Sequence, residues 1–288
     1  MINKLAIIGV GLIGGSLARA LRQSGHVGDV VGFGRSLGKL QTAVDLGVID
    51  RAEVSLAATV RGADMVVVAV PVATIKPILS ELAPLMVDGA VVTDIGSVKG
   101  VVVQAAREAL GARYAVFVPG HPIAGTEHSG VAASQAELFQ GHHVILTPDN
   151  DTDPAALARV RAMWQATGAD VLIMSVVQHD EILAACSHLP HMLAYALVDM
   201  LVRRDDHKKT FDLAAGGFRD FTRIASSDPV MWRDICVGNS DALVRVLQAY
   251  RDNLDVLISA IVRGDADWLE DTFNRAKRAR DDYIKRDG

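Results

Sequence analysis

The sequence contains little cysteine: only Cys186 and Cys236 occur among its 288 residues, far apart and without a C-x-x-C pair. This pattern argues against a disulfide framework or a cysteine metal site, and it predicts two buried thiols in a reducing compartment. No unbroken apolar run approaches the roughly 18 residues that cross a bilayer, so we expect no membrane partner. The apolar stretch after Lys4 superficially resembles a signal peptide but lacks a small-residue cleavage site.

Excess positive charge is also absent. The formal net charge is −5, and no basic stripe with interleaved aromatic residues occurs, so we expect no nucleic-acid partner. Half of the residues are hydrophobic, which supplies a substantial core and disfavours an extended disordered region. The chain also lacks internal repeats and low-complexity segments. Together these features predict a cytoplasmic globular protein with one large or two medium domains.

A glycine-rich turn lies near the start of the chain. Gly9, Gly11 and Gly14 have the G-x-G-x-x-G spacing, between a buried-strand pattern at 5–8 and an amphipathic stretch at 16–23. In such a turn the first glycine allows a tight exit, the second lets a pyrophosphate approach the backbone, and the third allows close helix packing. The free N–H groups of the helix start favour phosphate. An ordinary glycine-rich turn is the alternative, but the strand–turn–helix context favours a dinucleotide site.

The end of the second predicted strand bears on the choice between NAD and NADP. Gly34 stands where an acidic residue would bind the ribose 2′-hydroxyl, and Arg35 and Ser36 follow it. A guanidinium offers a planar set of donors to a 2′-phosphate. We therefore expect NADP to be favoured over NAD. The alternative is that Arg35 is merely solvated and that Asp45 or Asp29 contacts the ribose.

The pattern of the chain changes near residue 175. Before it, short apolar strands at 5–8, 30–33, 65–70, 90–94, 116–118, 143–146 and 171–173 alternate with helices such as 39–45 and 154–166. This alternation predicts an α/β fold with a doubly wound, Rossmann-type parallel sheet. After it, helices are expected at 177–203 (with one kink at Pro190), from Asp228-Pro229, at 242–262 and at 267–285. We expect a dinucleotide-binding domain at 1–175 and an all-α domain at 176–288.

Four further segments carry polar groups suited to chemistry. They read D-I-G-S-V-K (94–99), G-H-P-I-A-G-T-E (120–127), S-H-L-P-H (187–191) and G-G-F-R-D-F-T-R (216–223). With these segments the chain resembles the prephenate/arogenate dehydrogenase family (TyrA type, cyclohexadienyl dehydrogenases) from residue 5 to about residue 234. The joint occurrence of the last three segments is far more specific than the glycine turn.

The resemblance implies an enzyme of tyrosine biosynthesis. Members of this family oxidatively decarboxylate prephenate or arogenate: a hydride passes to NAD(P)+, carbon dioxide leaves, and the ring becomes aromatic. The helical domain is then expected to form a homodimer and to help bind a small cyclohexadienol. No residue of the sequence decides between prephenate and arogenate.

The resemblance also assigns roles to polar side chains. His121 matches the catalytic histidine that takes the proton of the ring hydroxyl, and a structural turn histidine is the alternative. Ser97 matches a serine that hydrogen-bonds this histidine near the nicotinamide, and it can also cap a helix. Arg223 matches the arginine that binds a substrate carboxylate, with an interhelical salt bridge to Asp220 or Glu127 as the alternative.

Other residues are expected to line the two binding sites. His191 matches a substrate-site histidine, whereas His188 is expected to be packed behind it, and no third ligand makes the pair a metal site. Trp232 is expected to wall the pocket or to be a core aromatic. The substrate-binding residues are then Arg223, His191, Glu127, Gly216, Asp220 and Trp232. The cofactor-binding residues are Gly9, Gly11, Leu12, Ile13, Gly14, Arg35, Ser36, Val70 and Ser97.

Two other functions remain open from the sequence. A hydroxyacid dehydrogenase or imine reductase also has a dinucleotide domain followed by helices, but such enzymes commonly place a catalytic lysine or aspartate on a helix of the second domain. A non-catalytic protein that senses dinucleotides would keep the glycine turn without needing the histidine and arginine segments. Turnover of prephenate or arogenate with either cofactor distinguishes these alternatives.

Overall fold

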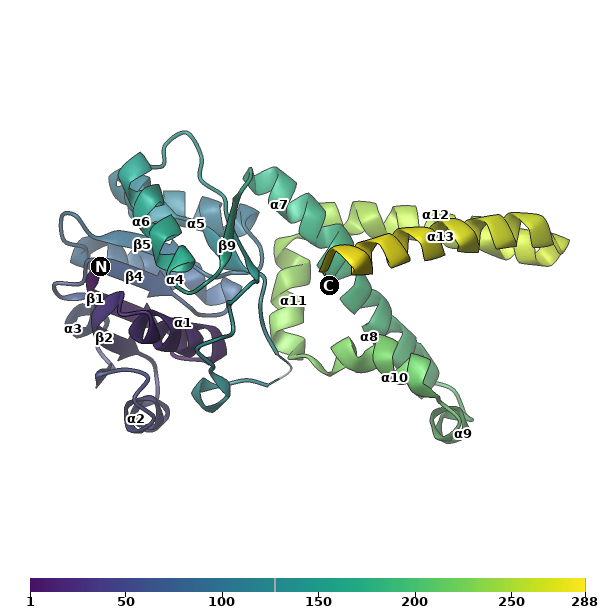
Figure 1. Cartoon of the computed structure of the whole chain (residues 1–288), viewed down its shortest axis with the longest axis horizontal. Coiled ribbons are helices and arrows are strands. Elements are labelled where there is room, and N and C mark those ends of the chain that lie inside the picture. The colour runs from purple at the N-terminus through teal and green to yellow at the C-terminus, as the bar shows by residue number, and fades with distance from the viewer. Residues whose placement is uncertain (127, 288) are drawn as a thin grey trace. The chain divides into compact units, whose positions relative to one another are not determined.

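The structure is a computed structural model that describes residues 1–126 and 128–287. The chain forms two compact units, Met1–Ser240 and Asp241–Gly288, and each is described by itself. The first unit holds all strands of the described chain and the helices that end before residue 240 (Figure 1). Every residue expected in a site belongs to this unit.

The centre of the first unit is a six-stranded, all-parallel sheet in the order β3-β2-β1-β4-β5-β6. Its strands are β1 (Ile2–Ile8), β2 (Val27–Phe33), β3 (Arg51–Glu53), β4 (Met65–Val68), β5 (Val91–Asp94) and β6 (Phe117–Val118). The predicted doubly wound parallel sheet is confirmed. The short edge strand β3 was not predicted, because its three residues carry little apolar signal.

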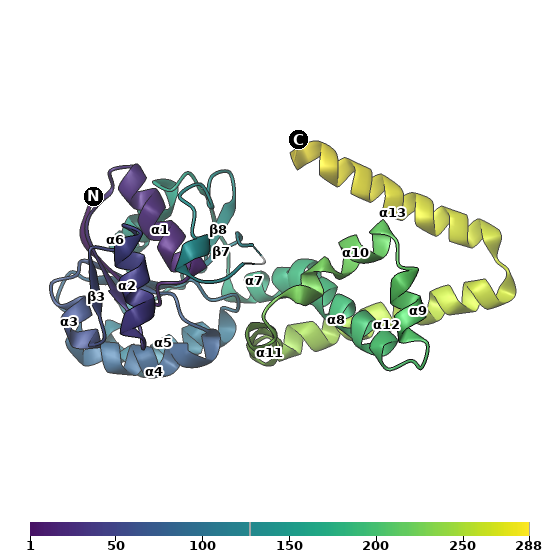
Figure 2. The ribbon, with the colours of Figure 1, turned by 90° about the horizontal axis from the view of Figure 1, so that it is seen from below.

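Helices cover both faces of this sheet. The helices of this region are α1 (Leu12–Gln23), α2 (Leu37–Asp45), α3 (Leu56–Val60), α4 (Val72–Leu82), α5 (Gly100–Leu110) and α6 (Pro154–Gln165). Figure 2 shows α1 and α6 on one side and α4 and α5 on the other. Leu5 and Ile7 of β1 join one buried cluster with α1 and α6, whereas Ala6 and Ile8 join a second cluster with α4 and α5. Short 3-10 turns are η1 (Ala83–Leu85), η2 (Gly111–Val116) and η3 (Val131–Ala133). Burial on both faces explains why the strands read as continuous apolar runs.

A second, three-stranded sheet lies beside the first and corrects the expectation of one continuous sheet. It contains β7 (Gly120–Pro122), β8 (His143–Leu146) and β9 (Asp170–Ile173), with β7 antiparallel to β8. Pro119 separates β6 from β7, and a proline has no N–H to continue a ladder. His121 therefore stands inside a strand, opposite Ile145, and not in the turn after β6.

The helical part of the first unit begins after Ser175, whose side chain accepts a hydrogen bond from the Gln178 N–H. The expected single helix at 177–203 is divided into α7 (Val176–Leu183), a π turn η4 (Ala184–His188) and α8 (Leu189–Val202). Pro190 lies in the first turn of α8, where its missing N–H costs no hydrogen bond, so the π turn and not a proline kink interrupts the helix.

Further helices complete this unit: α9 (His207–Asp212), α10 (Gly216–Thr222), η5 (Arg223–Ser226) and α11 (Pro229–Gly238). The predicted start of α11 is confirmed, because the Asp228 side chain accepts from the N–H groups of Val230 and Met231. In the second unit, α12 (Ser240–Arg263) and α13 (Ala266–Asp287) are joined by a turn with Gly264 at φ +67°.

By length and composition, the described part of the chain holds one helical stretch able to span a membrane, Val176–Val202. The sequence analysis considered only unbroken apolar runs and did not anticipate it. The core helix of a water-soluble protein passes the same test, so the finding is weak evidence of a membrane span.

The two cysteines differ from expectation. Cys186 is exposed, and Cys236 is half-buried with its Sγ 3.1 Å from Sδ of Met192. The prediction of a buried thiol is wrong for Cys186. It lies two positions from both Ala184 and His188, which are buried, and residues two apart point to opposite sides of a helical turn.

The close packing of α1 on β1 gives a stability prediction. A Cβ at Gly14 would lie 2.9 Å from Ile7 Cγ2 and 2.6 Å from the Gly9 oxygen, whereas a Cβ at Gly38, also in a first helical turn, would meet nothing within 4 Å. We expect Gly14→Ala to lower the free energy of unfolding by about 1–3 kcal/mol through overpacking. We expect Gly38→Ala to raise it by up to ~1 kcal/mol. Urea unfolding of both variants checks this, and equal effects would contradict it.

Candidate active site

The glycine turn forms an open cradle at the carboxyl end of β1. Gly9 has φ +98°, and a Cβ there would lie 2.3 Å from the Ala69 oxygen, so only glycine suits this exit. A Cβ at Gly11 would meet no atom within 4 Å, so the backbone there is open to an approaching group. Gly11 is also the N-cap of α1, and the first N–H groups of a helix have no acceptor within it. The cradle therefore fits a pyrophosphate.

The end of β2 lies beside this cradle. The Gly9 N–H donates to the Phe33 oxygen at 2.9 Å, which brings the residues after β2 next to the turn. Arg35 and Ser36 are both exposed there. The Ser36 hydroxyl accepts from the Lys39 N–H at 3.5 Å, so it already caps α2.

Neither aspartate considered for the ribose is at this end of β2. Asp29 stands near the start of the strand, and its carboxylate is paired with Arg51. Asp45 is the last residue of α2 and accepts a hydrogen bond from Gln41 at 2.9 Å. Of the charged residues considered for the ribose, Arg35 is therefore the one beside the cradle.

The other residues expected at the cofactor lie around the same turn. Leu12 and Ile13 are the first two residues of α1 and pack against the core cluster of that face. Val70 follows β4, and its Cγ1 would be 3.0 Å from a Cβ on Gly9. All three side chains are half-buried.

A fully buried ion pair, Lys99 with Asp94, lies at the carboxyl end of β5. The ammonium of Lys99 lies 2.5 Å from Oδ2 of Asp94 and donates to the Gly120 oxygen at 2.6 Å, and both charged side chains are wholly inaccessible. Asp94 also accepts from the N–H groups of Gly96 at 2.7 Å and Gly120 at 3.1 Å. Burial lowers the pKa of Lys99, whereas the Asp94 charge opposes that shift. The pair joins the end of β5 to the first residue of β7.

His121, the next residue of β7, is buried, with 8% of its surface exposed. Its Nδ1 lies 2.9 Å from Nε2 of His179, and the two rings meet edge to face with centroids 5.1 Å apart. Burial lowers the pKa of His121 well below its ordinary value, and His179, Lys99 and His188 lower it further. The imidazole is therefore neutral at pH 7 and can accept a proton.

His179 and Asp180, at the start of α7, were not singled out from the sequence. His179 is fully buried, and its Nδ1 lies 2.7 Å from Oδ1 of Asp180. Asp180 accepts from the N–H groups of Lys99 at 2.9 Å and Gly100 at 2.8 Å, at the start of α5. The adjacent histidine and aspartate soon after the cap residue Ser175 are a recognisable signal, but their partners stand far away in the sequence.

Ser97 is half-buried in the turn after β5, between Asp94 and Lys99 in the sequence. The expected hydrogen bond from Ser97 to His121 is not made among the described residues, where the partner of Nδ1 is His179. Ser97 does not cap α5 either, because the N-cap residue is Lys99 and the carboxylate of Asp180 takes the first N–H groups.

Trp232 packs against both histidines of the S-H-L-P-H segment. Its ring stacks on His191 with centroids 3.7 Å apart and an angle of 22°, and it meets His188 edge to face at 6.0 Å. Trp232 is 6% exposed and packs with Val98 and Ile235, while its indole N–H is buried without a hydrogen-bond partner in the described chain. It is thus a core aromatic that also presents a ring face to His191.

His188 is buried and hydrogen-bonded. Its Nδ1 lies 3.2 Å from the Asn239 side-chain nitrogen, which also donates to the Asp180 backbone oxygen at 2.8 Å. Burial lowers the pKa of His188 to about 4, so it is neutral at pH 7. Among the described residues, no three histidine, cysteine or acidic side chains cluster as a metal site.

His191 is half-buried, and its Nδ1 donates to the Ser187 oxygen at 2.8 Å. Burial lowers the pKa of His191, the hydrogen bond to the Ser187 oxygen opposes that shift, and the charge of Arg223 lowers the pKa further. Arg223 begins η5 and is exposed, as are Asp220 and Gly216 on α10. Ring contacts thus connect His188, Trp232 and His191.

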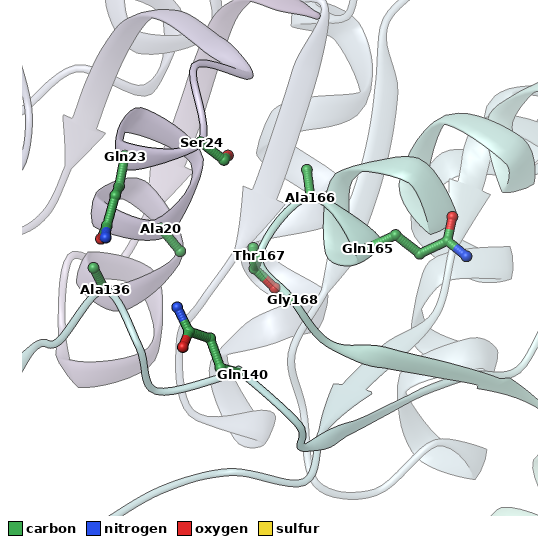
Figure 3. A pocket seen from close by; sticks show the side chains of 9 residues that line it. All are labelled: Ala20, Gln23, Ser24, Ala136, Gln140, Gln165, Ala166, Thr167 and Gly168. Atoms are coloured by element: carbon green, nitrogen blue, oxygen red, sulfur yellow. The ribbon is translucent and has the colours of Figure 1, made fainter.

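Glu127, expected at the substrate, lies outside the described residues. A pocket of about 390 Å³ opens elsewhere, where the end of α1 approaches the turn after α6 (Figure 3). Side chains such as Gln23, Gln140 and Gln165 line it, and no residue expected in a site does so. Since α1 starts at the carboxyl edge of the sheet, its end marks the opposite edge.

Two family models match the chain: "Prephenate dehydrogenase, nucleotide-binding domain" over residues 17–173 and "Prephenate dehydrogenase, dimerization domain" over residues 175–275. A cyclohexadienyl dehydrogenase of Zymomonas mobilis is 38% identical over 278 residues, covering 96% of this chain and 94% of that protein. The structure is similar to that of A. aeolicus prephenate dehydrogenase in complex with hydroxyphenyl propionate and NAD+, with TM-score 0.91, 40% identity and 97% of each chain covered. Synechocystis arogenate dehydrogenase matches with TM-score 0.83 and 32% identity, covering 97% of this chain and 99% of that one.

The buried ion pair gives a second stability prediction. Lys99→Met removes the ammonium and leaves the Asp94 carboxylate buried without its counter-charge, so we expect the free energy of unfolding to fall by about 3–5 kcal/mol. Lys76→Met is the matched control, because Lys76 pairs with Glu108 on the surface, and we expect little change there. Urea unfolding measures both, and similar losses in the two variants would contradict the prediction.

Proposed function

The chain belongs to the prephenate dehydrogenase family, and on that premise we propose that it oxidatively decarboxylates a cyclohexadienol, prephenate or arogenate, with hydride transfer to a nicotinamide dinucleotide. The product is 4-hydroxyphenylpyruvate or tyrosine, together with carbon dioxide. The observation that carries the proposal for this chain is His121, a buried neutral imidazole on β7 beside the end of β5.

The bound dinucleotide supplies the hydride acceptor, and the protein supplies orientation and proton handling. We assign its pyrophosphate to the cradle of Gly9, Gly11 and Gly14, which is open at Gly11. Leu12, Ile13, Val70 and Ser97 surround the same strand ends and are assigned to the cofactor. His121 takes the hydroxyl proton of the substrate at Nε2, since its Nδ1 is occupied by His179. Ser97 is assigned a place next to that hydroxyl.

The acid groups of the substrate require a cation at the other end of the site. Arg223 is assigned to a carboxylate, which a guanidinium binds with two parallel hydrogen bonds. His191 and Trp232 are assigned to the substrate ring and side chain, supported by their stacked contact and by the nearby charge of Arg223. Gly216, Asp220 and Glu127 remain proposals that rest on the resemblance alone.

We assign the cofactor preference to NADP. The support is the position of Arg35 after β2, beside the cradle, together with the distance of Asp29 and Asp45 from it along β2 and α2. A guanidinium there binds the 2′-phosphate of NADP, which NAD lacks. The NAD+ complex of the A. aeolicus protein shows which cofactor that relative binds.

The domain boundaries and the assembly are also proposals. We assign residues 1–175 to dinucleotide binding and residues 176–288 to substrate binding and homodimer formation. The assembly is supported by the match to a dimerization domain and by exposed apolar side chains on α12 and α13, among them Ile258, Ile261 and Phe273. A cytoplasmic location is proposed with them, in keeping with a biosynthetic role.

Steady-state kinetics on the four combinations of prephenate or arogenate with NAD or NADP test the reaction. In a combination that turns over, we expect His121→Asn to lower kcat by about 10²–10⁴-fold with little change in KM, because the base is lost. We expect Arg223→Ala to raise the substrate KM by about 10–100-fold, from ~1.5–3 kcal/mol of charged hydrogen bonding. The reverse pattern would mean that the two roles are misassigned, and no turnover in any combination would reject the reaction.

Arg35→Ala tests the cofactor assignment. We expect kcat/KM for NADP to fall by about 10–100-fold, while that for NAD changes by less than about threefold, because only NADP carries the 2′-phosphate. Arg61→Ala is the control, since Arg61 is exposed and lies just after α3, at the opposite edge of the sheet. A wild-type preference for NAD that Arg35→Ala leaves unchanged would contradict the assignment.

A further inference from the structure

We propose that His179 and Asp180 are positioning residues that hold His121 in one tautomer, with its proton on Nδ1 and its lone pair on Nε2. The proposal rests on the role of His121 as the base of the proposed reaction. The three side chains form an unbroken hydrogen-bonded chain that runs from the start of α7 to β7.

The direction of each hydrogen bond follows from Asp180. An ionised carboxylate only accepts, so Nδ1 of His179, 2.7 Å from Oδ1, carries a proton. The proposed arrangement has no second proton on His179, so its Nε2, which lies 2.9 Å from Nδ1 of His121, carries a lone pair. That contact is a hydrogen bond only if His121 donates, so its own lone pair is on Nε2.

Asp180 is held in its ionised form by its surroundings. Burial raises the pKa of this carboxyl, but the hydrogen bonds from His179 and from the backbone N–H groups of Lys99 and Gly100 outweigh burial, so its pKa lies below the ordinary value. The two N–H groups belong to the first turn of α5, where the helix dipole favours a negative charge. The hydrogen-bonded series from His121 through His179 therefore ends at an ionised carboxylate, that of Asp180.

The charge of Asp180 also matters during proton transfer. The charge of Lys99 disfavours protonation of His121, and Lys99 is in turn paired with Asp94. When the O–H bond of the substrate breaks and an Nε2–H bond forms, the hydride passes to the oxidised dinucleotide and the positive charge stays on His121. His179 connects that charge to Asp180 through two hydrogen bonds, and no second proton needs to move.

Variants at position 179 separate tautomer control from structural support. His179→Leu removes the acceptor for the Nδ1–H group while Asp180 still bonds to α5, and we expect kcat to fall by about 10²-fold or more with KM nearly unchanged. His179→Gln offers a side-chain oxygen in place of Nε2, and we expect it to recover at least about tenfold of that loss. Ser175→Ala removes the cap of the same helix but leaves the hydrogen bonds among His121, His179 and Asp180 in place, so its kcat should match the wild type.

Equal kcat in the Leu and Gln variants overturns the proposal. If His179→Leu does not fold, the tautomer of His121 in the wild-type protein still tests it.

Nitrogen NMR of the histidine-labelled wild-type protein at neutral pH tests the tautomer without turnover. The His121 signals are assigned by their loss in His121→Asn. We expect a protonated Nδ1 and an unprotonated Nε2 on both His121 and His179. A protonated Nε2 on His121 overturns the proposal. A wild-type protein with protonated Nδ1 on His121 but no turnover rejects the proposed reaction and leaves the proposed hydrogen bonds of His121, His179 and Asp180 standing.

Discussion

The wholly buried pair of Lys99 and Asp94 is the interaction on which the rest of the site depends. The ammonium joins the end of β5 to the start of β7, and the backbone N–H of Lys99 joins the start of α5 to Asp180 on α7. Three segments distant in sequence are thereby tied to one residue. A buried pair of this kind contributes little net stability, but losing one partner is costly, so the arrangement is held as a whole.

The residues of the candidate site lie in two different environments, one buried and one exposed. At the inner end, His121 and His188 are kept neutral by burial, which suits a group that accepts a proton from a hydroxyl. At the outer end, Arg223 is exposed and suits the carboxylate of a small acid. Trp232 connects the ends, since its ring contacts His188 and His191. This polarity suits a substrate with a reacting hydroxyl at one end and charge at the other.

The features that the sequence predicted well are those with a local physical cause. The parallel sheet follows from apolar runs alternating with amphipathic helices, and the start of α11 follows from the Asp228-Pro229 cap. The hydrogen bonds of Asp180 with Lys99 and Gly100 join residues some 80 positions apart. The sequence around either segment does not predict them. For the same reason the second sheet, which places His121 inside a strand, was missed. Cys186 is exposed because the opposite side of η4 packs against residues distant in the sequence, such as Trp232 against His188.

A crystal structure with an oxidised nicotinamide dinucleotide and a 4-hydroxyphenyl acid bound together tests the central claim most directly. The account predicts that Nε2 of His121 lies about 2.6–3.2 Å from the phenol oxygen, a hydrogen-bonding distance for a base. It also predicts that Arg223 binds the carboxylate and that the pyrophosphate lies over the turn from Gly9 to Gly14. A phenol oxygen bound away from His121, or a dinucleotide away from that turn, would contradict it.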